Sequence, residues 1–123
     1  MGHVLIAEDD ATSLEILCQI VVQSENVPIR ARNGFLALEI LRENPKLIDI
    51  VITDLVMPQM DGRDLIQKIR SDARLKHVPI LVQSGYLGVY AISELLEAGA
   101  TEVLPKPVNA QTLLGYLQHH IGK

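Results

Sequence analysis

Along its whole length, the sequence alternates between short apolar segments and longer segments in which apolar residues recur with the period of an α-helix. This alternation is typical of a parallel sheet with helices on both faces. We therefore predict a single doubly wound α/β fold with an open, five-stranded parallel sheet, because a closed barrel of this kind needs eight repeats. The expected strands are residues 3–7, 28–32, 49–53, 79–83 and 101–105. The expected helices are residues 12–24, 35–43, 62–71, 88–98 and 109–121.

Residues at the helix ends support these boundaries. Thr12 and Glu15 have the spacing of a capping box at the start of the first helix. Asp61 and Asn109 are suitable N-caps for the third and fifth helices. Gly99 is expected to end the fourth helix, because glycine readily adopts the backbone conformation that follows a helix.

Size and composition limit the class of protein. A chain of 123 residues fits one domain, and its single cysteine, Cys18, excludes an internal disulfide and favours a reducing, cytoplasmic location. The helical spacing of Cys18 with Leu14, Leu17 and Val21 indicates a core position. A net charge of −4 and an aromatic content of 3% argue against direct binding of nucleic acid. No apolar run reaches the roughly 18 residues that a membrane span needs.

Asp54 directly follows the apolar residues of the third expected strand. A buried, ionised carboxylate is costly unless it is paired or binds a metal, so this residue should lie at an open strand end. The carboxyl ends of parallel strands meet at one edge of a sheet, where ligands bind. The residues that follow the other strands at this edge are Glu8, Asp9, Asp10, Ser84 and Lys106. We interpret Asp10 as a charge that favours the start of the first helix rather than as a metal ligand.

These residue types indicate one kind of chemistry. Clustered carboxylates repel one another and bind a hard cation such as Mg²⁺, which also recruits phosphate oxygens. A carboxylate is able to act as a nucleophile and form an aspartyl phosphate. A lysine would neutralise the transferred group, and a serine hydroxyl would donate a hydrogen bond to it. The set therefore predicts Mg²⁺-assisted phosphoryl transfer onto Asp54.

Four motifs carry a resemblance to a known family: AEDD (7–10), TDLVMPQMDG (53–62), QSG (83–85) and PKP (105–107). At these spacings the sequence resembles the receiver domain of two-component response regulators over residues 1–123. The resemblance implies a flavodoxin-like (αβ)5 fold with strand order 2-1-3-4-5. It also implies that Asp54 receives a phosphoryl group from a phosphohistidine on a histidine kinase or a histidine phosphotransfer protein.

The resemblance also implies roles for individual residues. Mg²⁺ would be held by Asp9, Asp54 and the backbone carbonyl of Val56, and Glu8 would act through water. Ser84 and Lys106 would bind the phosphoryl group, and the peptide bond before Pro107 is expected to be cis. The switched surface would be formed by residues 88–98, 101–105 and 109–121, and would contact a downstream effector protein or output domain.

The sequence departs from the family pattern at the switch. Many receivers have a tyrosine or phenylalanine three residues before the lysine, where this chain has Val103. Output is therefore expected to depend on shifts of the loop and helix at residues 84–98. Val56 and Tyr86 would flank the phosphoryl group and offer little to orient a hydrolytic water beyond the tyrosine hydroxyl. We therefore predict slow loss of the phosphoryl group.

Ile16 and Ile20 lie near the boundary of the polar face of the first helix, four residues apart. They could belong to a broad buried stripe. They could equally form a docking stripe beside Asp54 for the helical bundle of a phosphotransfer partner.

Two other function classes fit the sequence less well. A receiver-like interaction module that works without phosphorylation would be expected to lack a site residue, and none is missing. A small Mg²⁺-dependent hydrolase would need a general acid and a substrate pocket, which the four histidines do not supply. We therefore expect a protein that is not an enzyme, apart from catalysing its own phosphorylation and dephosphorylation.

Overall fold

The computed structural model describes residues 1–85 and 88–122. The strands are β1 (His3–Ala7), β2 (Val27–Ala31), β3 (Ile50–Asp54), β4 (Ile80–Ser84) and β5 (Glu102–Pro105). The helices are α1 (Ala11–Gln23), α2 (Gly34–Glu43), α3 (Gly62–Arg70), α4 (Val89–Ala98) and α5 (Ala110–Leu117), followed by a π-helical turn, η1 (Gln118–Gly122). Within the described ranges, no helix combines the length and apolar character needed to cross a membrane.

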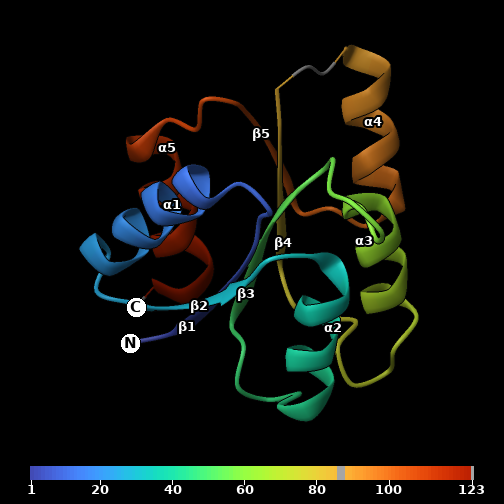
Figure 1. Ribbon diagram of the computed structural model, residues 1–123, viewed down its shortest axis with the longest axis horizontal. Coiled ribbons are helices and arrows are strands. Elements are labelled where there is room, and N and C mark those ends of the chain that lie inside the picture. The colour runs from blue at the N-terminus through green and yellow to red at the C-terminus, as the bar shows by residue number, and fades with distance from the viewer. Residues whose placement is uncertain (86–87, 123) are drawn as a thin grey trace.

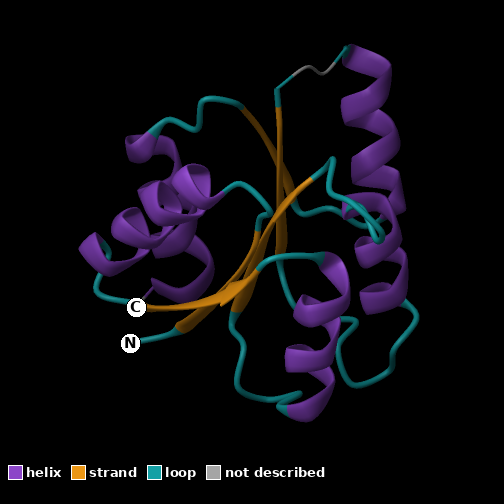
Figure 2. Ribbon diagram, in the orientation of Figure 1, coloured by secondary structure: helices purple, strands orange, loops and turns teal. Residues whose placement is uncertain are grey.

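The five strands form one parallel sheet in the order β2-β1-β3-β4-β5. Helices α1 and α5 cover one face, and α2, α3 and α4 cover the other (Figure 1). Figure 2 shows the resulting three layers, with the strands between two groups of helices. The predicted fold class and strand order are confirmed.

The core has one apolar cluster on each face of the sheet. Alternate strand residues point to opposite faces, so Leu5 and Val51 pack toward α2, α3 and α4. Ile6 and Ile52 join the cluster beneath α1 and α5. Burial on both faces explains why the central strands are almost continuously apolar in sequence.

Three predicted helix ends agree with the structure. Asp61 and Asn109 are the N-caps of α3 and α5, and each side chain accepts a hydrogen bond from a backbone N–H three residues later. Gly99 is the C-cap of α4 and has a φ of 122°, which only glycine adopts without strain. The last expected helix, residues 109–121, is divided into α5 and the π-helical turn η1. The four-residue spacing of Leu117 and Ile121 does not distinguish the two helix types, so the sequence did not predict this change.

The predicted capping box of the first helix is wrong. The N-cap is Asp10, whose Oδ2 accepts a hydrogen bond from Ser13 N at 2.8 Å. Glu15 instead pairs with Arg30 of β2, with Oε1 and Nη1 2.9 Å apart. The interpretation of Asp10 as a charge at the helix start is confirmed, and the hydrogen bond from Ser13 holds the pKa of this carboxyl below its ordinary value.

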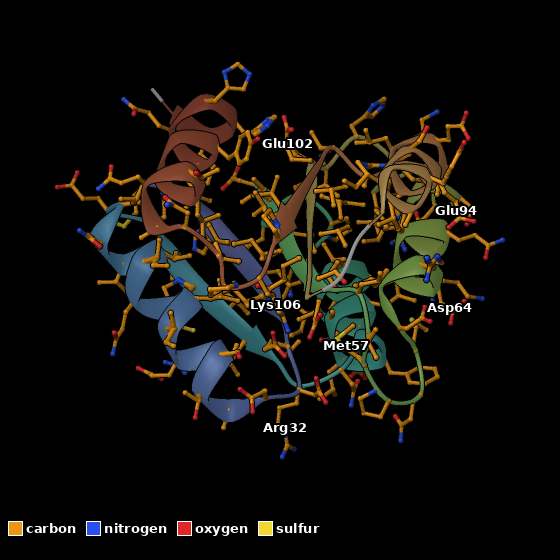
Figure 3. All side chains as sticks on the ribbon, turned by 90° about the horizontal axis from the view of Figure 1, so that it is seen from above. Arg32, Met57, Asp64, Glu94, Glu102 and Lys106 are labelled. Atoms are coloured by element: carbon orange, nitrogen blue, oxygen red, sulfur yellow. The ribbon has the colours of Figure 1, made fainter. Side chains whose placement is uncertain are left out.

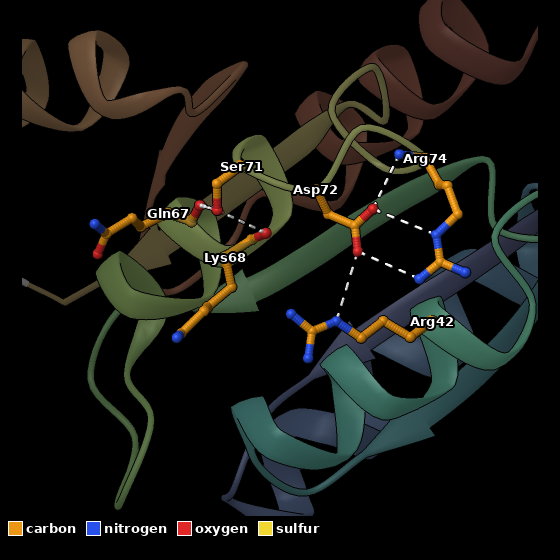
Figure 4. A network of polar contacts seen from close by, with 6 residues as sticks. All are labelled: Arg42, Gln67, Lys68, Ser71, Asp72 and Arg74. Atoms are coloured by element: carbon orange, nitrogen blue, oxygen red, sulfur yellow. Dashed lines mark hydrogen bonds and ion pairs between the residues drawn. The ribbon is translucent and has the colours of Figure 1, made fainter.

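A polar network closes the end of the molecule that lies opposite the carboxyl ends of the strands (Figure 4). Asp72, just after α3, accepts hydrogen bonds from Arg74 and lies 3.6 Å from Nε of Arg42 on α2. Ser71 Oγ donates to the carbonyl of Gln67 at 2.7 Å. These contacts connect α2, α3 and the α3–β4 loop.

Candidate functional site

Four strands bring polar side chains to one edge of the sheet. Glu8 and Asp9 follow β1, Asp54 ends β3, Ser84 ends β4 and Lys106 follows β5. Figure 3 looks onto the molecule from above and labels Lys106 near the middle, with α1 on one side and Met57 of the β3–α3 loop on the other. The edge predicted from the strand ends is therefore assembled as expected.

The acidic residues form a tight cluster. One carboxylate oxygen each from Glu8, Asp9 and Asp54 lies within 4.8 Å of the others. Glu8 and Asp54 are buried, with 1% and 6% of their surface exposed, whereas Asp9 is exposed. The cluster is therefore open to solvent on the side of Asp9.

Glu8 is the most strongly perturbed of these acids. Its Oε1 accepts a hydrogen bond from Gln83 Nε2 at 2.8 Å, and its Oε2 accepts one from Asp10 N at 3.2 Å. Burial, reinforced by the nearby charge of Asp54, raises the pKa of Glu8 to about 7. The hydrogen bond from Asp10 and the charge of Lys106 oppose this rise without cancelling it.

Lys106 links the acids to β5. Its Nζ lies 2.7 Å from Asp54 Oδ2 and 3.7 Å from Glu8 Oε1. Partial burial alone would lower the pKa of Lys106, but the hydrogen bond to Asp54 and the charges of both acids raise it above its ordinary value. Lys106 N also donates to Ser84 O at 2.9 Å, and the Lys106–Pro107 peptide bond is cis, the isomer that the resemblance implies.

The β3–α3 loop holds the backbone of Asp54 in place. Leu55 continues the sheet by donating its N–H to the carbonyl of Gln83 on β4, and Gly62 N donates to Leu55 O at 2.8 Å. A Cβ on Gly62 would lie only 2.6 Å from Asp54 O, so this approach requires glycine. Met57, at the start of the loop, is buried in the core beneath it.

The donor set suits a hard divalent cation. All three clustered side chains offer oxygen ligands, which Mg²⁺ prefers. Among the described residues, the ion pairs of Glu8 and Asp54 are both with Lys106, at 3.7 and 2.7 Å, and a dication would add positive charge beside them. Val56 follows Asp54 by two residues in the same loop, so its backbone lies close in sequence to the cluster.

Comparison with known proteins agrees with this geometry. The family model of the response regulator receiver domain matches residues 4–118. The chain belongs to this family. The two-component response regulator ORR5 of Oryza sativa subsp. japonica is 33% identical over 106 residues, which cover 86% of this receiver domain and 78% of that protein. Histidine kinase P4 of Formosa agariphila is 31% identical over 108 residues, which cover 88% of this chain but only 8% of the kinase.

Solved structures show the same fold. A response regulator receiver domain protein from Clostridium thermocellum has a TM-score of 0.90 and 28% identity, with 98% of this receiver domain and 94% of that chain covered. The chemotaxis protein CheY4 of Vibrio cholerae has a TM-score of 0.88 and 28% identity, with 98% of each chain covered. The acidic cluster of this receiver domain fits the phosphorylation and Mg²⁺ site of the family.

The residues expected to control switching and the lifetime of the phosphoryl group are Val56, Tyr86 and Val103, and the two that the structure describes differ in burial. Val103 on β5 is half-buried and packs against the cluster beneath α2, α3 and α4. Val56 has 73% of its surface exposed at the site edge. Tyr86 lies outside the described residues.

The two isoleucines of the expected docking stripe, Ile16 and Ile20, differ in their exposure to solvent. Ile16 has 52% of its surface exposed on α1. Ile20 is only 7% exposed and packs in the core between α1, α5 and the sheet, so its assignment to an exposed docking stripe is wrong. The physical reason is that α1 packs against α5 as well as against the sheet, which widens its buried face.

Gln83 was missed as a contact of the site. It ends the expected strand at 79–83 and begins the QSG motif, but neither pattern predicts its hydrogen bond to Glu8. The available signal was its polarity within a buried strand, because such a side chain needs a hydrogen-bond partner.

Proposed function

We propose that residues 1–123 form one receiver domain in which Asp54 accepts a phosphoryl group from a phosphohistidine on a histidine kinase or a histidine phosphotransfer protein. The observation that carries this proposal is the buried carboxylate of Asp54, held 2.7 Å from Lys106 Nζ beside two further acids. A carboxylate in this setting is fixed in position at the edge of the sheet, beside the exposed Asp9. A fixed position at this edge favours nucleophilic attack on phosphorus.

The transfer step forms one bond and breaks one. A side-chain oxygen of Asp54 attacks phosphorus, and the bond from phosphorus to the donor nitrogen breaks. The imidazole leaves with the bonding electron pair and takes a proton from solvent. The product is a mixed anhydride of the Asp54 carboxyl group, which carries the high-energy phosphoryl group.

The surrounding residues would stabilise the negative charge of the phosphoryl group during its transfer. Lys106 neutralises the phosphoryl oxygens, and the Ser84 hydroxyl donates a hydrogen bond to one of them. Asp9, Asp54 and the carbonyl of Val56 would hold Mg²⁺, with Glu8 acting through water. When bound, Mg²⁺ supplies charge neutralisation at the phosphoryl oxygens.

We further propose that the exposed Ile16 contacts the phosphohistidine partner. It lines a cavity of about 340 Å³ between α1 and the β5–α5 loop, together with Lys106 and Pro107. An apolar side chain beside the phosphoacceptor edge suits the packing of a helix from the donor protein. The surface formed by α4, β5 and α5 would then transmit the phosphorylated state to an effector protein or output domain. Since Val103 replaces the usual aromatic residue, this output would depend on shifts of the β4–α4 loop and of α4.

Phosphoryl incorporation tests the acceptor. The protein is incubated with acetyl phosphate and Mg²⁺, and its intact mass is measured beside Asp54→Asn and an EDTA control. Asp64→Asn, at an exposed aspartate of α3, is the matched control. We expect one phosphoryl group on the wild type and on Asp64→Asn, and none on Asp54→Asn or without metal. Failure of the wild type to gain a phosphoryl group would replace this proposal with a phosphorylation-independent interaction module.

Transfer from two donors tests the docking role. Ile16→Ser is expected to slow transfer from a phosphohistidine protein but not from acetyl phosphate. Val22→Ser removes a similarly exposed residue farther along α1 and is expected to change neither rate. Equal slowing of Ile16→Ser with both donors would contradict docking.

A further inference from the structure

Gln83 is a polar side chain within a buried strand. It is 2% exposed and lies in β4 opposite Asp54 of β3, one residue before Ser84. Its neighbours along the strand, Leu81 and Val82, are fully buried apolar residues. A buried amide at this point loses its hydration, so a specific partner must compensate for that cost.

That partner is Glu8. Gln83 Nε2 donates to Glu8 Oε1 at 2.8 Å, and the bond is buried. The other carboxylate oxygen of Glu8 accepts the Asp10 N–H at 3.2 Å. Each oxygen of Glu8 is therefore held by one donor, and the rotation of the carboxylate is restricted.

Lys106 does not fulfil the same role. Its Nζ is 3.7 Å from Glu8 Oε1, too far for a hydrogen bond, whereas it is 2.7 Å from Asp54 Oδ2. The lysine is thus committed to Asp54, and under the proposed function it would turn to the phosphoryl group. Gln83 would keep its bond to Glu8 throughout.

We infer that Gln83 is a positioning residue for the Mg²⁺ site and orients the carboxylate of Glu8 toward the water through which it would act on the cation. This inference rests on the proposed function, because it assigns a support to the same metal site. Removing the partner of a side chain that binds the metal directly typically changes metal affinity by about 10- to 100-fold. Because Glu8 would act through water, we expect the loss for Gln83 at the lower end of this range. If the amide merely filled the core, its removal would lower only the stability of the fold. As a positioning residue, its removal should weaken metal binding.

Magnesium titration of full-length variants tests the inference. Gln83→Met removes the donor but keeps the length of the side chain, and Gln83→Asn keeps an amide that is one methylene too short. Ile52→Val removes one methylene from the same sheet without touching any acid of the site, and so controls for a loss of stability. Affinity for Mg²⁺ is measured by isothermal titration calorimetry, and stability is measured by urea unfolding in EDTA.

Both Gln83 variants are expected to bind Mg²⁺ about tenfold more weakly than the wild type, while Ile52→Val binds as the wild type does. With acetyl phosphate, the Mg²⁺ concentration for half-maximal phosphorylation should rise, and the rate at saturating Mg²⁺ should return to the wild-type value. If Gln83→Met does not fold, Gln83→Asn decides. Wild-type affinity in a folded Gln83 variant overturns the inference. A wild type that binds Mg²⁺ without accepting a phosphoryl group refutes the proposed function instead, and leaves the role of Gln83 in metal binding intact.

Discussion

The buried carboxyl group of Glu8 makes the stability of the metal-free protein depend on pH. Its pKa is about 7 in the folded chain and 4.5 as an ordinary glutamate. Between these values the unfolded chain has released the proton that the folded chain retains, so the free energy of unfolding falls as pH rises. Each pH unit inside this window costs about 1.4 kcal/mol. Between about pH 5 and pH 8, the loss attributable to this group is therefore roughly 2–3 kcal/mol.

Glu8→Gln removes the ionisation and keeps a side chain of the same shape. Urea unfolding in EDTA is measured for both proteins across this pH range. We expect the wild type to lose roughly 2–3 kcal/mol relative to Glu8→Gln as pH rises. Glu43→Gln removes a carboxylate from the exposed face of α2 and should keep the wild-type pH dependence. Saturating Mg²⁺ should flatten the wild-type curve, because the dication favours the ionised form.

The opposite result would be informative. If wild type and Glu8→Gln show the same pH dependence in EDTA, then Glu8 does not retain its proton in the folded chain. The desolvation inferred from its burial would then be offset by water that enters from the side of Asp9. The expected flattening of the wild-type curve by Mg²⁺ would fail with it.

Three further predictions concern stability and are all read from urea unfolding curves. Gly62→Ala should destabilise the protein by about 1–3 kcal/mol, because the added Cβ would lie 2.6 Å from a backbone oxygen of β3. Gly115→Ala, which has open space around it on α5, should instead stabilise the protein by about 0.5–1 kcal/mol. Equal effects of the two substitutions would contradict the close approach at Gly62. Arg70→Met should cost roughly 2–3 kcal/mol, because the guanidinium donates hydrogen bonds to three backbone carbonyls, and an unchanged midpoint would show those bonds to be dispensable. Ile20→Ser should cost at least about 2 kcal/mol and Ile16→Ser less than about 0.5 kcal/mol, so similar losses would refute the different burial of the two side chains.

The fold and the position of the site were predictable because both follow from regular features. Alternating periodicities determine a parallel sheet, and a parallel sheet brings its carboxyl ends together. Asp54 and Lys106 could therefore be placed on one edge although 52 positions separate them in the chain. The strand boundaries agree to within one residue at every end, and β1, β3 and β4 are largely compact apolar runs that locate the sheet.

The errors lie where two local patterns compete or where a distant partner decides. Asp10 and Thr12 are both residue types that cap the N-terminus of a helix. In the structure the N-cap is Asp10, whose side chain accepts a hydrogen bond from Ser13 N. Glu15 forms an ion pair with Arg30 instead of bonding to the start of the helix. Arg30 is fifteen positions away, so a pattern of neighbouring residues does not reveal this partner. Ile20 lies in the same buried cluster as Leu113 and Leu117 of α5, which are more than ninety positions away in the chain.

The charge balance at the strand ends connects the metal, the phosphoryl group and the switch. Among the described residues, the ion pairs formed by the site carboxylates all involve Lys106, so one cation serves Asp54 and Glu8 together. Phosphorylation of Asp54 would add negative charge to a cluster that already raises the pKa of Glu8. Under the proposed function, Lys106 Nζ would turn from Asp54 Oδ2 to the phosphoryl oxygens, while the backbone N–H of Lys106 donates to the carbonyl of Ser84. A movement that reached the backbone of this lysine would act on the ends of β4 and β5 together. Under the proposed function, this backbone link would connect the site to β5 without the aromatic side chain that Val103 replaces.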